Sequence, residues 1–71
     1  MNKINEQNQV IELNLERNEL LGLPPEIFKL KYLKKLNLSN NGLTRIPEKM
    51  GQLVNLQELD LSNNKLTNVT E

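Results

Sequence analysis

Two glutamates and one lysine recur at equal spacing along this chain, and their side chains could perform acid–base chemistry. Glu12, Lys35 and Glu58 are separated by 23 residues each. If they occupy equivalent positions on neighbouring strands, the two carboxylates lie about 9.6 Å apart, with the ammonium group between them. An open sheet provides no enclosed pocket that would shift a pKa or exclude water. The spacing therefore favours a cross-strand row of alternating charge over a catalytic carboxylate pair.

The composition argues against other catalytic centres as well. Nucleophilic catalysis of the triad type needs a base, usually histidine, and the chain contains no histidine and no cysteine. Any metal would need oxygen ligands, and the sequence shows neither an acidic cluster that could hold one nor a glycine-rich loop that could cradle a phosphate. We therefore expect no enzymatic activity, no cofactor and no metal.

Charge and hydropathy limit the partners and the location of the protein. Nine basic and nine acidic residues cancel, which disfavours a nucleic-acid or anionic-membrane partner. Residues 1–9 are polar apart from Met1 and Ile4 and lack the apolar stretch of a secretory signal. No apolar run approaches the ~20 residues of a membrane span, and the lack of cysteine fits a reducing compartment. These features predict a soluble, cytoplasmic chain without nucleic-acid or membrane partners.

The spacing of 23 residues extends through the whole sequence. Six positions keep their chemical type in three successive copies, and a fixed period of this length is typical of repeat architectures. The three sets are Val10, Leu13, Leu15, Asn18, Leu20 and Leu23; Leu33, Leu36, Leu38, Asn41, Leu43 and Ile46; and Leu56, Leu59, Leu61, Asn64, Leu66 and Val69.

The first part of each copy predicts a strand and a turn. In the first copy Leu13 and Leu15 alternate with polar neighbours, which is the pattern of a strand with one buried face. An asparagine follows each strand, at Asn18, Asn41 and Asn64. Its amide can donate to and accept from backbone groups that the turn leaves unpaired. We interpret these asparagines as structural rather than catalytic.

The second part of each full copy predicts one short helical or 3₁₀ turn, over residues 26–30 and again over residues 48–53. Prolines precede both segments, and proline is tolerated in the first turn of a helix but breaks a helix that runs into it. A continuous amphipathic helix over residues 43–56 is the alternative. Pro47 and Gly51 lie inside that span and disfavour it.

These motifs resemble the leucine-rich-repeat family, whose pattern is L-x-x-L-x-L-x-x-N-x-L followed by a variable segment. The second and third copies match it, and Val10 is a mild departure in the first. The variable segment resembles the 23-residue subclass with L-P-x-x-I-x-x-L, as in Ile46-Pro47 with Met50 and Leu53. The resemblance implies an α/β fold, a short horseshoe segment of a solenoid. Three parallel strands would line its concave side, short helical or 3₁₀ turns its convex side, and the asparagines would form an internal ladder.

The repeat boundaries divide a single domain, which is either complete or a fragment of a longer protein. Residues 1–9 are expected to form a partial N-terminal repeat that caps the stack, with residues 4–9 as its second half. Residues 10–32 and 33–55 form repeats 1 and 2, and residues 56–71 an incomplete repeat 3. An uncapped end exposes apolar surface and strand edges, so we expect the isolated chain to self-associate through its C-terminal repeat.

The resemblance implies that ligands bind the concave sheet, and it predicts a protein-binding module. The alternative is a structural solenoid building block, or the N-terminal segment of a larger signalling protein of the GTPase or kinase type, self-associating when isolated. The sheet residues include no aromatic anchor, which leaves open that they are merely solvated. The candidate partner-binding residues are Glu12, Asn14, Glu16, Lys35, Asn37, Ser39, Glu58, Asp60 and Ser62, with an outer column of Arg17, Asn40 and Asn63.

Overall fold

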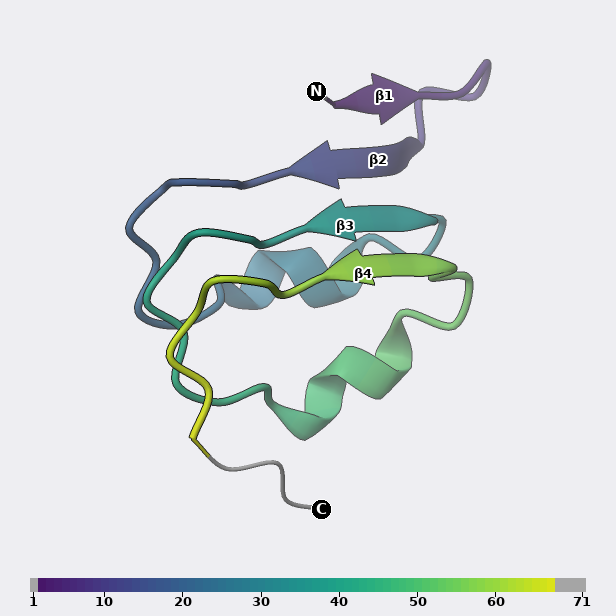
Figure 1. Ribbon diagram of the computed structural model, residues 1–71. Helices are drawn as coiled ribbons and strands as arrows, with labels where there is room; N and C mark the ends of the chain where they lie inside the picture. Colours follow the sequence, from purple (N-terminus) through teal and green to yellow (C-terminus); the bar gives the residue numbers. More distant parts are fainter. Residues whose placement is uncertain (1, 68–71) are drawn as a thin grey trace.

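The computed structural model describes residues 2–67, in which one sheet faces two short 3₁₀ helices (Figure 1). Val69, the last position of the third copy, lies outside the described residues. The strands follow one another across the sheet in the order β1-β2-β3-β4. The elements are β1 (Lys3–Ile4), β2 (Val10–Asn14), η1 (Pro25–Lys29), β3 (Lys35–Asn37), η2 (Glu48–Gln52) and β4 (Glu58–Asp60).

The strand register reproduces the 23-residue period. Leu13 pairs with Leu36, and Leu36 pairs with Leu59, so equivalent residues of the three copies lie side by side. Strands β2, β3 and β4 are parallel. Strand β1 pairs with β2 in the antiparallel sense. The sheet is therefore mixed and has four strands, which confirms only in part the expectation of three parallel ones.

The N-terminal residues form a hairpin with β2 instead of the second half of a repeat, which corrects the expectation for residues 4–9. Ile4 pairs with Val10 across the hairpin. The side-chain oxygen of Asn5 accepts hydrogen bonds from the backbone N–H groups of Gln7 (3.0 Å) and Gln9 (2.9 Å). Asn8 adopts a left-handed conformation with φ of 64°. Asparagine tolerates both arrangements, so a local turn brings β1 back onto β2.

The two helices are short because proline sets where each begins and i→i+3 hydrogen bonds close each turn. Pro24 precedes η1 and Pro47 precedes η2, both with extended backbone. The backbone N–H of Ile27 donates to Pro24 (3.1 Å), and that of Met50 donates to Pro47 (3.1 Å). These bonds define 3₁₀ geometry. The prediction of short turns is confirmed, and the alternative of a continuous helix over residues 43–56 is wrong.

The core lies between the sheet and the helices, and it is densest in the middle copy. Leu33, Leu38 and Leu43 have no exposed surface, and Leu36 is 2% exposed. Full burial of one leucine side chain contributes about 1.5–3 kcal/mol. The equivalent leucines of the first and third copies are only half-buried, and Leu59 is 38% exposed. Among residues 2–67, only the middle copy lies between two other copies that cover its apolar layer.

Candidate functional site

A row of alternating charges crosses the face of the sheet that points away from η1 and η2; we call this face the open face. The Lys35 ammonium lies 3.8 Å from the Glu12 carboxylate and 3.6 Å from the Glu58 carboxylate. The Lys3 ammonium lies 3.9 Å from the same oxygen of Glu12. The predicted ladder of alternating sign is confirmed. Its fourth member, Lys3, was missed because the strand that carries it lies outside the repeat.

The accessibility of this charge row increases from β2 to β4. The side chain of Glu12 is 24% exposed, that of Lys35 is 48% exposed, and that of Glu58 is 67% exposed. Exposed ion pairs contribute only a few tenths of a kcal/mol each to stability. The row therefore contributes little to the fold, and its charges near β4 are the most available to a partner.

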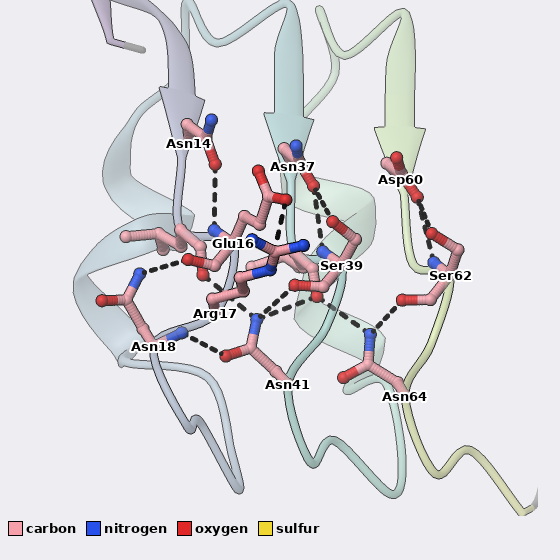
Figure 2. Close-up of polar contacts among 12 residues, drawn as sticks. Asn14, Glu16, Arg17, Asn18, Asn37, Ser39, Asn41, Asp60, Ser62 and Asn64 are labelled. Carbon is pink, nitrogen blue, oxygen red and sulfur yellow. Dashed lines mark hydrogen bonds and ion pairs between the residues drawn. The ribbon is translucent and has the colours of Figure 1, made fainter.

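The neighbouring row of Asn14, Asn37 and Asp60 ends the three parallel strands. In each residue the side-chain oxygen Oδ1 accepts a hydrogen bond from the backbone N–H two residues further on, at 2.9, 2.9 and 3.0 Å (Figure 2). These are Asx turns, in which the side chain accepts from a backbone N–H group just beyond the end of the strand. One acceptor of each residue is thus committed to the fold.

Asp60 differs from its two asparagine neighbours in being ionisable. The Ser62 hydroxyl donates to its Oδ1 at 2.7 Å, and the Ser62 backbone N–H donates to the same atom. These two hydrogen bonds hold the pKa of the Asp60 carboxyl below its ordinary value of 3.8, because they stabilise the ionised form. Asp60 thus adds a negative charge to the exposed β4 side of the open face.

The third candidate column is not uniformly available. Ser39 is only 4% exposed, and its hydroxyl donates to Asn37 Oδ1 at 2.7 Å. Ser39, a candidate partner-binding residue, is therefore largely covered by the chain itself. The first and third copies cover Ser39 from both sides. The Arg17 backbone N–H donates to the carbonyl group of Ser39, and the backbone N–H of the next residue, Asn40, donates to the carbonyl group of Ser62. Ser62 itself is exposed.

The first member of the third column is Glu16, and it stays partly accessible. Its side chain is 33% exposed, and a carboxylate oxygen lies 3.8 Å from the Arg17 guanidinium. Its backbone N–H is held by Asn14. Glu16 therefore presents a charge at the β2 end of the open face, although at a greater distance from the charge row.

The outer column of Arg17, Asn40 and Asn63 is determined by backbone geometry. Their φ angles are 60°, 58° and 58°, all in the left-handed region. Asparagine enters this region more readily than other residues with a side chain. The two asparagines are thus explained by the turn, and arginine at the first position adopts the same conformation at an energetic cost.

The turn asparagines form the predicted internal ladder (Figure 2). The Asn41 amide nitrogen donates to the carbonyl groups of Leu15 (3.1 Å) and Leu38 (2.9 Å). Its oxygen accepts from the backbone N–H groups of Asn18 (2.9 Å) and Leu20 (3.0 Å). One side chain thus bonds its own copy and the preceding one, and the structural interpretation is confirmed.

The third asparagine extends the ladder by one step. Asn64 donates to Leu38 (2.9 Å) and Leu61 (3.0 Å), and it accepts from the Leu43 backbone N–H (3.0 Å). As Asn41 does, it therefore bonds both its own copy and the preceding one. The carbonyl group of Leu38 is shared between Asn41 and Asn64, which links all three copies through side-chain amides.

The open face is shallowly hollowed as well as charged. A shallow depression of about 390 Å³ lies over β2, β3 and β4, with Lys35 and Asn37 at its centre. Within residues 2–67, no group of three acidic, histidine or cysteine side chains is arranged to hold a metal ion. None of the helices described is long and apolar enough to cross a membrane. The surface can offer ion pairs and hydrogen bonds to another molecule.

The comparison with family models agrees with the repeat and with its geometry. The model described as Leucine rich repeat matches residues 8–66. The chain therefore belongs to the leucine-rich-repeat family, whose members are commonly modules for protein interaction. Assignment to the 23-residue subclass stays a prediction. Neither the curated proteins nor the solved structures yield a match to this chain.

Proposed function

We propose that this chain is a protein-binding module and that its partner contacts the open face of the sheet. The observation that carries the proposal is the charge row, in which Glu12, Lys35 and Glu58 lie side by side and are increasingly exposed toward β4. These charges stabilise the fold only slightly, so they are free to serve recognition. Each carboxylate is paired with a lysine, and we therefore favour binding over catalysis.

The charge pattern defines the partner that would fit. A complementary surface carries a basic group opposite Glu58, an acidic group opposite Lys35, and polar groups at the level of Asn37 and Asp60. Alternating charges at the inter-strand spacing of about 4.8 Å determine how a partner is aligned on the sheet. They contribute more to this alignment than to the affinity of binding. A partner of uniform charge would meet repulsion at every second position, so we expect a folded protein surface of mixed charge.

Capture of a partner from a cell extract by the immobilised chain tests this proposal. Lys35→Glu reverses the central charge, and we expect it to lower the amount of captured partner at least ~10-fold, which corresponds to about 1.4 kcal/mol. Lys49→Glu makes the same charge change on η2, away from the open face, and should leave capture unchanged. Circular dichroism verifies that both variants are folded.

Two results of this experiment would contradict the proposal. Equal capture by Lys35→Glu and the original chain would exclude the open face as the binding surface. Loss of capture with Lys49→Glu alone would place the binding surface on the helical side. In both cases the family assignment would be unaffected, but the proposed binding site on the open face would be wrong.

A second proposal, self-association of the isolated chain, is favoured by the exposure of its last layer. Leu59 is 38% exposed although its equivalent Leu36 is buried. Within the described residues β4 has a strand neighbour on one side only. Free strand edges beside apolar surface favour pairing with another chain. Sedimentation velocity tests this proposal, because a single monomeric species at every concentration would contradict it.

A further inference from the structure

We propose that copies of this chain associate head to tail, with the free edge of β4 in one copy pairing with the free edge of β1 in the next. This inference rests on the proposed self-association and names the two surfaces that meet. Strands β1 and β4 are the two outer strands of the sheet (Figure 1). Each therefore has one edge without a strand neighbour among residues 2–67, and unpaired strand edges template pairing with another chain.

The charge row would continue across this junction with its signs still alternating. Within one copy the row reads Lys3, Glu12, Lys35, Glu58, with a positive group at the β1 edge and a negative group at the β4 edge. Because β1 pairs with β2 at the level of Glu12, Lys3 of a second copy would lie beside Glu58 of the first. Opposite charges on neighbouring strands stabilise pairing.

The apolar column next to the charge row would continue in the same way. Ile4 pairs with Val10, which is equivalent to Leu33 and Leu56 at the 23-residue spacing. Ile4 is 58% exposed, and Leu59 of the last strand is 38% exposed. A head-to-tail junction would bring Ile4 of one copy to the level of Leu56 in the other and cover the Ile4 side chain, while the added copy would give the layer of Leu59 a neighbour. Charge and apolar surface therefore favour one and the same register.

Symmetric pairing is disfavoured by the same charges. Two copies of β4 in antiparallel contact would place Glu58 near Asp60 of the other copy, and all these groups are acidic. Two copies of β1 would bring their Lys3 ammonium groups together. Like charges directly opposite one another destabilise a strand pair. The junction between unlike edges is the only one of these three that pairs opposite charges.

A junction between unlike edges does not close on itself. Each added copy presents a new free β4 edge, and such heterologous contacts generate open chains unless a rotation closes a ring. The pairing strands are only two and three residues long, so each junction is weak. We expect a gradual rise of the average mass with concentration rather than a fixed dimer.

Zero-length carbodiimide cross-linking of the unaltered chain tests the proposal directly. The reagent joins an amine and a carboxylate that are already in contact. Lys3 and Glu58 of one copy are separated by three strand spacings, about 14 Å, so a Lys3–Glu58 link must join two copies. Mixing unlabelled and ¹⁵N-labelled chains identifies such links by mass spectrometry. The Lys35–Glu58 pair, 3.6 Å apart within one copy, provides the internal control.

The expected result is a mixed-isotope Lys3–Glu58 link whose yield rises between about 10 μM and about 1 mM protein. The average mass in sedimentation should pass that of a dimer over the same range. Glu58→Gln should lower the association about 2–5-fold, whereas Glu48→Gln, on η2, should leave it unchanged. High salt should weaken it, since the pair is exposed.

Two results would overturn the inference and are distinguishable from each other. A dimer of constant mass without the Lys3–Glu58 link would contradict head-to-tail pairing and leave self-association standing. A monomer at every concentration would contradict both. Neither result would touch the proposed partner binding, which the Lys35→Glu capture experiment tests independently.

Discussion

Replacement of Asn41 by alanine should remove a large part of the stability of the chain. The Asn41 side chain makes five hydrogen bonds, three as donor and two as acceptor. The partners of these bonds are polar backbone groups, and an apolar contact cannot replace a hydrogen bond to such a group. Asn41→Ala leaves the backbone in place and removes only their partner.

The loss of folding free energy in Asn41→Ala depends on which of these backbone groups keep another hydrogen-bond partner. The carbonyl group of Leu38 retains its bond from Asn64, and that of Ser39 retains its bond from the Arg17 backbone N–H. Asn18 is exposed, so water can bond its N–H group. The carbonyl group of Leu15 and the N–H of Leu20 lose their partner in half-buried surroundings. At about 1–2 kcal/mol for each orphaned group, the variant loses about 2–4 kcal/mol.

Urea unfolding followed by circular dichroism measures this loss. With a denaturant dependence of about 1 kcal/mol/M, the midpoint should fall by about 2–4 M. A chain of this length has a total stability of about 4–11 kcal/mol, so the loss ranges from about a fifth of the total to all of it. Asn18→Ala is the matched control. That asparagine donates one bond of 3.3 Å from an exposed position, and its loss should cost less than about 1 kcal/mol.

The comparison of the two variants decides the argument. Equal loss of stability in Asn41→Ala and Asn18→Ala would refute the reasoning, because the two residues occupy the same place in the repeat and differ in burial and in the number of bonds that their side chains make. A small loss for Asn41→Ala alone would show that water satisfies the groups we count as orphaned.

Three further outcomes follow from the open face and its turns. Lys35→Ala should lower the free energy of unfolding by less than about 1 kcal/mol, and the difference from the original chain should shrink in high salt. Ser62→Ala should raise the pKa of Asp60 toward its ordinary value in an NMR titration. Because that pKa is lowered by folding, the ionised Asp60 stabilises the fold at higher pH, and the contribution should be lost as the pH falls through the folded-state pKa; unchanged titration in the variant would contradict the hydrogen-bond assignment. Arg17→Asn, which copies Asn40 of the next repeat, should stabilise the chain by roughly 0.5 kcal/mol, a rise of about 2–4 °C in Tm; a lower Tm would contradict the assigned strain at φ 60°.

The repeated part of the fold could be predicted because equal spacing imposes equal environments. Leu36 and Leu38 lie where the alternation placed them, and Asn41 makes the backbone bonds that its position after the strand required. The charge row followed from the same spacing, as Glu12 and Lys35 are direct neighbours. Each of these predictions needed only the period and the preference of leucine for the interior.

Features that depend on the place of a copy within the stack could not be read from the repeat. Ser39 and Ser62 have the same residue type and the same position, yet Ser39 is buried and Ser62 is exposed. Burial of Ser39 requires a copy on each side, which the pattern within one repeat does not encode. The N-terminal hairpin was missed for a related reason, since Asn5 and Asn8 determine it locally and the 23-residue register pointed elsewhere.

The most direct test of the proposed function is the reactivity of individual lysines toward an acylating reagent, measured by mass spectrometry with and without the captured partner. Lys35 lies at the centre of the open face, whereas Lys29 and Lys49 lie in η1 and η2 on the opposite side of the molecule. Binding through the open face predicts strong protection of Lys35 and unchanged reactivity of Lys29 and Lys49. Protection of the two helical lysines with full reactivity of Lys35 would contradict the account.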